Sequence, residues 1–152
     1  MKTSVLVAAS LALGTVQASE LEIEVRRNGS TPSVIGKEAN FTGHAVITSL
    51  LPANDVTNAN LGLVDFAPGA RTAWHTHPNG QLLIVTSGRG WVQKEGQERQ
   101  EIKPQDVVWI PAGVKHWHGA TDTSPMSHLA MTYMLDGKNV EWMVPVTDEQ
   151  YR

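Results

Sequence analysis

The sequence predicts a single all-β domain built as a sandwich or a barrel. No stretch after residue 18 shows a convincing 3.6-residue apolar period, so no long helix is expected. Short β-rich runs recur instead between turn signals, and 13 glycines and 8 prolines supply the punctuation. A length of 152 residues suits one domain and leaves little room for two.

The first eighteen residues are typical of a secretory signal peptide. Lys2 precedes an apolar stretch from Val5 to Val16, and Val16-Gln17-Ala18 offers small residues before a cleavage site. The stretch is shorter than the ~20 apolar residues that span a bilayer. We expect residues 1–18 to be a signal peptide, residues 19–152 to be the folded domain, and the protein to be periplasmic or secreted. An N-terminal helix or strand packed on the domain is the alternative.

The candidate strands follow one another along the mature chain with turns between them. The turns are Ala-Pro-Gly at 67–69, Pro-Asn-Gly at 78–80, Ser-Gly-Arg-Gly at 87–90, Pro-Ala-Gly at 111–113 and Asp-Gly at 136–137. The candidate strands are Leu21–Arg26, Phe41–Thr48, Leu61–Ala67, Thr72–His77, Gln81–Thr86, Gly90–Lys94, Asp106–Ile110, Val114–His118, His128–Leu135 and Glu141–Val146.

Charge and cysteine content exclude several classes of function. Twelve Lys and Arg against fifteen Asp and Glu give a net charge of −3, and no basic run supports binding to nucleic acid or to an anionic membrane. The absence of cysteine excludes disulfides, thiolate metal sites and cysteine nucleophiles. Any metal must therefore be held by histidine, oxygen or amide ligands.

Five of the six histidines fall where strands could bring them together. His75 and His77 form one His-x-His pair and His116 and His118 another, so within each pair the side chains point to one face of a strand. His128 lies on a later strand. Two such pairs on a β scaffold can converge on a divalent metal through imidazole nitrogens. The alternative is that the histidines are scattered surface or hydrogen-bonding residues. The sixth histidine, His44, has no partner in the sequence, and we interpret it as a strand or surface residue.

Two segments resemble the two motifs of the cupin family. Gly69 to His75-Thr-His77, then Gln81 and Gly88, resembles the first motif, and Asp106 through Pro111-Ala-Gly113 to His116 resembles the second. Gln81 stands where most cupins have glutamate, and Gln105 replaces the glycine that usually opens the second motif. The resemblance covers roughly residues 40–135 and implies a single-domain cupin, a jelly-roll barrel. The fold alone does not specify the reaction.

A narrower resemblance is to the bacterial manganese-dependent cupin hydroxynitrile lyases. It is carried by Pro-Gly-Ala-Arg-Thr-Ala-Trp-His-Thr-His at 68–77, Lys-His-Trp-His-Gly-Ala at 115–120 and Val-Thr-Asp-Glu-Gln-Tyr at 146–151. The segment 136–151 also resembles cupins related to carboxymuconolactone decarboxylases. The resemblance implies metal ligands, pocket histidines and pocket-lining residues. The ligands would be His75, His77, Gln81 and His116, the pocket histidines His118 and His128, and the lining residues Val64, Thr72 and Thr132.

That ligand set has a chemical consequence. Three imidazoles and a carboxamide place no negative charge on the metal, which disfavours iron oxygenase chemistry of the two-histidine-one-carboxylate type and favours Lewis-acid chemistry. The leading hypothesis is a metal-dependent carbon–carbon lyase that reversibly cleaves an α-hydroxynitrile to an aldehyde or ketone plus hydrogen cyanide. Mn²⁺ is the expected cofactor, with Fe²⁺, Zn²⁺ or Ni²⁺ as alternatives, and His118 or His128 is the expected acid–base.

Two other functions remain open at this stage. One is a metal-dependent dioxygenase or other oxidoreductase on the same site, and the other is a periplasmic cupin that binds a small ligand without turnover. The expected partners are a small-molecule substrate and further copies of the chain, in a homodimer or homotetramer for which the Leu21–Arg26 strand could pair. We expect most of the tryptophans to pack in the core or at such an interface. They are Trp74, Trp91, Trp109, Trp117 and Trp142.

Overall fold

The structure is a computed structural model that describes residues 22–152. The predicted signal peptide, residues 1–18, lies outside the described residues. Within residues 22–152, no helix is long and apolar enough to cross a membrane. The predicted all-β fold is confirmed: thirteen strands form two antiparallel sheets, and one short helix closes the described chain.

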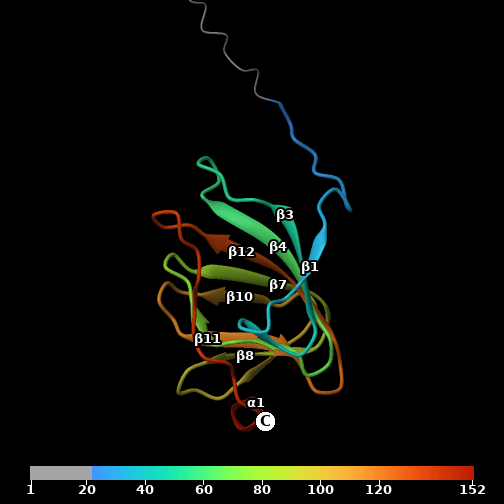
Figure 1. Cartoon of the computed structure of the whole chain (residues 1–152), viewed down its shortest axis with the longest axis vertical. Helices are drawn as coiled ribbons and strands as arrows, with labels where there is room; N and C mark the ends of the chain where they lie inside the picture. Colours follow the sequence, from blue (N-terminus) through green and yellow to red (C-terminus); the bar gives the residue numbers. More distant parts are fainter. Residues whose placement is uncertain (1–21) are drawn as a thin grey trace, which may run out of the picture.

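The first sheet has six strands in the order β1-β3-β4-β12-β7-β10. Figure 1 shows β3, β4, β12, β7 and β10 following one another across the molecule. The long strands alternate buried and less buried residues, as expected where one face covers an interior. The bounds are β1 Ser33–Ile35, β3 Ala45–Leu51, β4 Ala59–Phe66, β7 Gln81–Gly88, β10 Val107–Ile110 and β12 Met126–Tyr133.

The second sheet is built from shorter strands around β11. Its order is β13-β6-β11-β5-β2, and β8 pairs with both β11 and β9. All five residues of β11 are buried, because the barrel interior lies on one side and the C-terminal segment covers the other. The bounds are β2 Phe41–Thr42, β5 Arg71–Thr72, β6 His75–Thr76, β8 Gly90–Lys94, β9 Gln100–Ile102, β11 His116–Ala120 and β13 Glu141–Trp142.

Most predicted strands are present, but β1 and β9 lie outside every predicted run, and only Glu141–Trp142 of the predicted Glu141–Val146 run is a strand. Residues 22–26 form no strand, so the prediction for Leu21–Arg26 is wrong over the part that is described. The Phe41–Thr48 run is broken at Gly43, which has a φ of +77° that no strand residue adopts. The Thr72–His77 run is also broken, because the amide of Trp74 bonds to the carbonyl of Val144 in the C-terminal segment.

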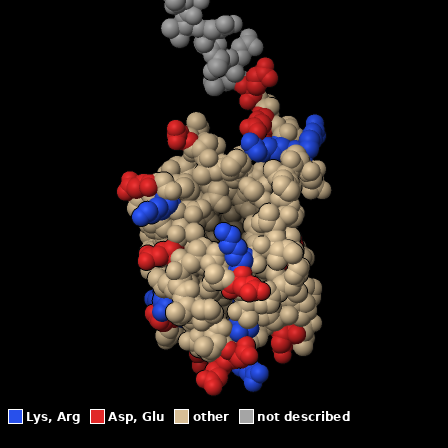
Figure 2. Space-filling view, in the orientation of Figure 1, with Lys and Arg blue, Asp and Glu red and all other residues tan. Residues whose placement is uncertain are grey.

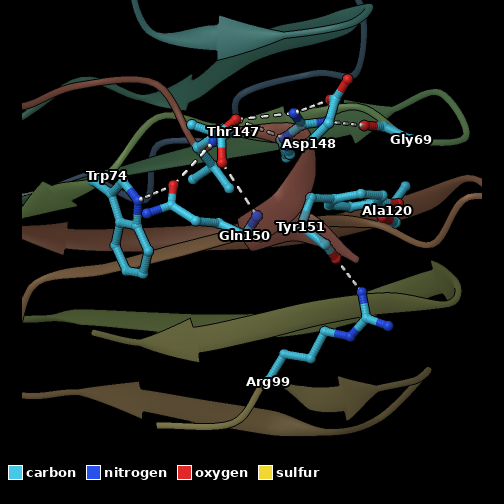
Figure 3. Close-up of polar contacts among 10 residues, drawn as sticks. Gly69, Trp74, Arg99, Ala120, Thr147, Asp148, Gln150 and Tyr151 are labelled. Atoms are coloured by element: carbon cyan, nitrogen blue, oxygen red, sulfur yellow. Dashed lines mark hydrogen bonds and ion pairs between the residues drawn. The ribbon is translucent and has the colours of Figure 1, made fainter. Parts of the chain in front are cut away.

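The last ten residues, 143–152, form a C-terminal strap across the outer side of the second sheet. Val146 and Tyr151 pack on Trp74 and on Trp117, which is completely buried. The strap ends in α1 (Asp148–Tyr151), which Thr147 caps in a capping box with Gln150. Figure 3 shows the polar contacts of the strap, including those from Trp74 to Gln150 and from Tyr151 to Ala120.

Arg71 is the main polar anchor of this strap. Its side chain is only 6% exposed, and its guanidinium donates to the Val146 carbonyl at 2.9 Å and to the Asp148 carboxylate at 2.7 Å. It also lies over the Tyr151 ring, at 4.6 Å from the ring centroid. Arg71 is followed on β5 by Thr72, which lines the cavity inside the barrel. The contacts of Arg71 therefore connect the strap to a strand of the cavity wall.

Candidate metal centre

Strand pairing brings the two His-x-His segments together. His75 on β6 lies directly opposite His116 on β11, and their ring centroids are 4.1 Å apart. His77, just beyond β6, has its ring centroid 5.0 Å from that of His75. His118 follows two residues after His116 on the same face, at 5.3 Å from His75. All four rings are buried.

A cavity of about 230 Å³ opens inside the barrel at this cluster. None of the side chains that line it is Lys, Arg, Asp or Glu. Figure 2 shows a hollow near the middle of the drawn face, with one basic and one acidic side chain directly below it and the other charged side chains nearer the periphery. The lining comprises Phe41, Ile47, Asn60, Gly62, Val64, Thr72, His75, His77, Gln81, His118, His128, Ala130, Thr132, Asn139, Val140 and Trp142.

Three backbone carbonyls fix the orientation of three imidazoles. The Nδ1 atoms lie 2.9 Å from Ala73 O for His75, 2.5 Å from Asn139 O for His77 and 2.8 Å from Val114 O for His116. A carbonyl can only accept, so Nδ1 carries the proton and Nε2 keeps its lone pair. The Nε2 atoms of His77 and His116 are buried and have no hydrogen-bond partner among the described residues. This is the arrangement that metal-binding histidines commonly show.

Gln81 presents an amide oxygen in the same way. Its side chain is buried at the start of β7, and its Nε2 donates to Thr132 Oγ1 at 3.0 Å. The strand register places Thr132 directly opposite Gln81. With the amide nitrogen bonded to Thr132, the oxygen Oε1 is buried without a partner among the described residues. A buried carbonyl-type oxygen in this state is suited to a cation.

His118 and His128 form a hydrogen-bonded pair beside the cluster. His128 Nε2 lies 3.0 Å from His118 Nδ1, and both rings are fully buried. Phe66 packs against both, with ring centroids 6.0 Å and 5.5 Å away. His118 Nε2 and His128 Nδ1 have no partner within the described part of the chain. Each ring therefore has one nitrogen in the pair and one nitrogen still available for a proton or a ligand.

Burial keeps all five histidines neutral at physiological pH. Removal from water lowers the pKa of His116 and of His128 to about 4. Burial, with the neighbouring imidazoles as the second cause, lowers the pKa of His75 and of His118 well below the ordinary value. Burial also lowers the pKa of His77. Neutral imidazoles are the form that binds metals, so protons compete weakly for this site.

The chain's own donor set fits a divalent cation. The ligating atoms of His75, His116 and His118 all lie within 4.8 Å of one another, and no charged ligand is present. The resemblance found in the sequence implied His77 and Gln81 in place of His118. Both of those residues also present a buried atom without a partner at the same cavity. The buried, unpartnered nitrogens and oxygen therefore supply enough ligands for a coordinated ion.

All the predicted site residues gather at this centre. Val64, Thr72 and Thr132 line the cavity as expected, and Thr72 Oγ1 also accepts a hydrogen bond from the backbone amide of His118. His44 is exposed, as predicted. The sequence reasoning missed several lining residues because they resemble ordinary core or loop residues, and it assigned Trp142 to packing. The missed lining residues are Phe41, Ile47, Asn60, Gly62, Ala130, Asn139, Val140 and Trp142.

Comparisons with known proteins agree with this architecture. The family described as "Cupin domain" matches residues 62–133. A protein from Granulicella tundricola named (R)-mandelonitrile lyase is 55% identical over 130 residues, which cover 86% of this chain and 99% of that protein. A cupin-like protein from Thermotoga maritima is 40% identical, with a TM-score of 0.74 over 86% of this chain and 95% of its own. A polyketide cyclase from Streptomyces resistomycificus, 15% identical with a TM-score of 0.67 over 86% of this chain and 91% of its own, shares the fold.

Proposed function

This chain belongs to the cupin family, and we propose that it is a metal-dependent hydroxynitrile lyase. It would cleave an α-hydroxynitrile reversibly into an aldehyde or ketone and hydrogen cyanide. The observation that carries the proposal is the set of buried, unpartnered imidazole nitrogens and one amide oxygen at an uncharged cavity. The 55% identity to a protein named (R)-mandelonitrile lyase supports the reaction class.

We propose that His75, His77, Gln81 and His116 hold the metal and that Mn²⁺ is the physiological ion. A divalent cation bound there would supply Lewis acidity toward a hydroxyl or carbonyl oxygen without a change of oxidation state. Because the three imidazoles and the amide are neutral ligands, they would not offset the positive charge of the metal ion. Fe²⁺, Zn²⁺ and Ni²⁺ compete for imidazole ligands, so the identity of the ion has to be measured.

The His118–His128 pair would move the proton. In the cleavage direction the hydroxyl proton passes to an imidazole nitrogen, the electron pair of the O–H bond forms the carbonyl, and the C–CN bond breaks with its pair on cyanide. Cyanide then takes the proton from the imidazole and leaves as hydrogen cyanide. A neutral imidazole can both accept and return the proton, and such a positioned acid–base contributes ~10²–10⁴-fold in rate.

The cavity walls favour a small, uncharged substrate with an apolar group. Ile47, Val64 and Val140 supply aliphatic surface, and Phe41 and Trp142 supply aromatic surface. These two aromatic rings lie 5.7 Å apart, so they form one continuous wall. An aryl group can pack on that wall while a hydroxyl group faces the histidines.

The direct test is cleavage of racemic mandelonitrile. The purified chain is loaded with Mn²⁺, and the release of benzaldehyde and of cyanide is measured. Cleavage of mandelonitrile yields the two products in equal amounts. The double variant His75→Ala/His77→Ala removes two ligands, and His44→Ala is the matched control because His44 is an exposed histidine that is not among the residues lining the cavity. We expect metal-dependent release by the unmodified chain and by His44→Ala, and no release by the double variant.

Three results would overturn the proposal. Equal release with and without bound metal would remove the metal from the reaction. No release by a chain shown to contain one metal ion, together with uptake of oxygen in the presence of an organic substrate, would favour a dioxygenase or another oxidoreductase. Retention of a small ligand with neither release nor oxygen uptake would favour a binding protein.

A further inference from the structure

A row of three polar side chains crosses the first sheet at the cavity. The strand register places Asn60 on β4 opposite Thr132 on β12, and Thr132 opposite Gln81 on β7. All three residues line the cavity and are called the polar row. Thr132 orients the Gln81 amide, whereas Asn60 makes no contact with that amide in the structure. Directly opposite residues have Cβ atoms ~4.5–5.5 Å apart, so Asn60 lies two strands away from a proposed metal ligand.

The side chain of Asn60 bonds to the loop that joins β12 to β13, residues 134–140. Its Oδ1 accepts a hydrogen bond from Asn139 Nδ2 at 2.8 Å. Both side chains are half-buried, and both line the cavity. The two residues are 79 positions apart in the chain, so this bond attaches the loop to a distant strand.

Other contacts fix the start and the tip of this loop. The Met134 carbonyl accepts hydrogen bonds from the side chains of Asn58 and Asn79, at 3.1 Å and 3.2 Å. Leu135 and Lys138 exchange two backbone hydrogen bonds around a tight two-residue turn. These contacts leave the end of the loop, which returns to the cavity, to be held by other groups.

Among the described residues, two hydrogen bonds hold Asn139 at that end. Its backbone carbonyl accepts from Nδ1 of His77 at 2.5 Å, and its side chain donates to Asn60. Without Asn60, the carbonyl would be held only by the ring that it has to orient. The bond to Asn60 therefore gives the carbonyl a fixed position. The His77 ring takes its direction from that carbonyl, and its buried Nε2 is left for a metal ion.

We propose that Asn60 is a positioning residue for metal binding, which acts through Asn139 on His77. The inference rests on the proposed ligand role of His77 and is independent of the reaction that the metal serves. The polar row then orients two of the four proposed ligands, because Thr132 holds Gln81 directly and Asn60 holds His77 through the loop. Groups that orient a metal-binding histidine typically change metal affinity by about 10- to 100-fold.

Titration of the metal-free chain with Mn²⁺ tests the proposal without any substrate. Asn60→Ala removes the acceptor, and it should raise the metal dissociation constant by about 10- to 100-fold. Asn139→Ala keeps the backbone carbonyl but removes the donor, so it should give a similar rise. Lys138→Ala is the matched control, because Lys138 is an exposed neighbour of Asn139 that does not line the cavity. It should leave the dissociation constant unchanged.

A double-mutant cycle with His77→Ala separates positioning from a general loosening of the fold. If Asn60 acts through His77, Asn60→Ala should cause no further loss of affinity once His77 has been replaced by alanine. A general loosening would lower the affinity by the same factor in both backgrounds. Because no substrate is present, a failure of this inference and a failure of the lyase reaction are observed separately.

Proteolysis of the unmodified chain covers the case in which the Asn60 variant fails to fold. Trypsin can cleave after Lys138 in the loop and after Arg27, an exposed residue outside the cavity lining. A metal ion on His77 would also fix Asn139, so Mn²⁺ should slow cleavage after Lys138 by about 5-fold or more. Cleavage after Arg27 should keep its rate.

Four outcomes would overturn the inference. One is an Asn60→Ala variant that binds Mn²⁺ as tightly as the unmodified chain while His77→Ala binds it weakly. The second is an equal loss from Asn60→Ala with and without His77, and the third is the same rate of cleavage after Lys138 with and without bound Mn²⁺. Unchanged affinity in His77→Ala would overturn the proposed ligand set and this inference together.

Discussion

His128 Nε2 and His118 Nδ1 lie 3.0 Å apart, at full burial, beside the candidate metal ligands. One proton lies between these two nitrogens, and it can belong to either ring. Because His118 Nε2 and His128 Nδ1 have no partner within residues 22–152, protonation at one end of the pair can release a proton at the other. The pair therefore couples proton uptake at one of these two outer nitrogens to proton release at the other.

This coupling predicts a separation between catalysis and metal binding. His118→Ala and His128→Ala should each lower kcat with mandelonitrile by ~10²–10⁴-fold, the contribution of a positioned acid–base. The reason is that each variant breaks the hydrogen-bonded pair and leaves one imidazole without its partner. Both variants should still contain one metal ion, whereas His75→Ala should lose metal and activity together. Elemental analysis and steady-state kinetics on the same samples measure the two quantities. If His118→Ala loses the metal while His77→Ala keeps it, the ion is held by the His75, His116 and His118 group instead.

Thr132 should control metal affinity through Gln81. Removing its hydroxyl in Thr132→Val leaves the buried Gln81 amide nitrogen without its acceptor, which costs ~1–3 kcal/mol. The amide is then free to turn its oxygen away from the histidines, so metal affinity should fall by about 5- to 150-fold. Titration calorimetry with Mn²⁺ measures this change. Thr132→Ser keeps the hydroxyl and should keep the affinity, and equal losses in both variants would contradict a role for the hydrogen bond.

The metal-free protein should lose stability as the pH falls from 6.5 toward 4. His116 and His128 have folded-state pKa values of about 4, against 6.5 for an ordinary histidine. Between these values the unfolded chain takes up protons that the folded chain excludes, so unfolding becomes easier as the pH falls. Each such histidine contributes ~1.4 kcal/mol per pH unit within that window. Urea unfolding in a chelating buffer at several pH values measures the slope, and a free energy that is constant between pH 7 and pH 5 would contradict it.

Gln105→Gly should stabilise the fold. Gln105 is exposed and has a φ of +77°, a left-handed conformation that costs a non-glycine residue ~1–2 kcal/mol. Glycine avoids that cost but loses ~0.5–1 kcal/mol through the greater freedom of the unfolded chain. We expect a net gain of about 0.5–1 kcal/mol by thermal unfolding. Gln97→Gly in the turn between β8 and β9 is the matched control, and it should destabilise, since Gln97 is not among the residues of positive φ.

The Gln105 backbone explains one departure from the family motif that the sequence alone could only record. The motif has glycine at this position, and the structure has a left-handed turn there that any residue other than glycine adopts under strain. The backbone amide of Gln105 donates a hydrogen bond to the Val85 carbonyl at 3.0 Å, and this bond stabilises the turn despite the strain. The sequence analysis placed no turn at Gln105, and the structure shows both the turn and its handedness.

The local sequence pattern predicted the long strands, but it did not predict the strand breaks that tertiary contacts determine. β12 alternates over all eight residues, and β4 and β7 alternate over most of theirs, so their inward faces could be expected from the sequence. The break between β5 and β6 depends on a backbone bond from Trp74 to Val144, which lies seventy residues later. The helix α1 is too short to show a period, and its capping box is the only local signal for it.

The histidines of the site could be predicted from the sequence, whereas the apolar residues of the cavity wall could not. Histidines spaced two apart on strands share a face, so His75, His77, His116 and His118 could be placed together before the structure was known. Phe41 and Trp142 could not, because an apolar side chain at a cavity wall has the same sequence pattern as one in the core. Asn139 accepts a hydrogen bond from His77 through its backbone carbonyl. Every residue has such a carbonyl, so the residue type at position 139 does not indicate this role.

The order of strand pairing determines when during synthesis the barrel can close. β4 pairs with β12, which is made more than sixty residues later, and Arg71 is anchored by Asp148 from the last turn of the chain. A nascent chain that lacks these late segments has an open interior and an uncovered Trp117. Closure therefore follows synthesis of β12 and of the strap, and the growing chain depends on its surroundings to remain soluble until those segments emerge.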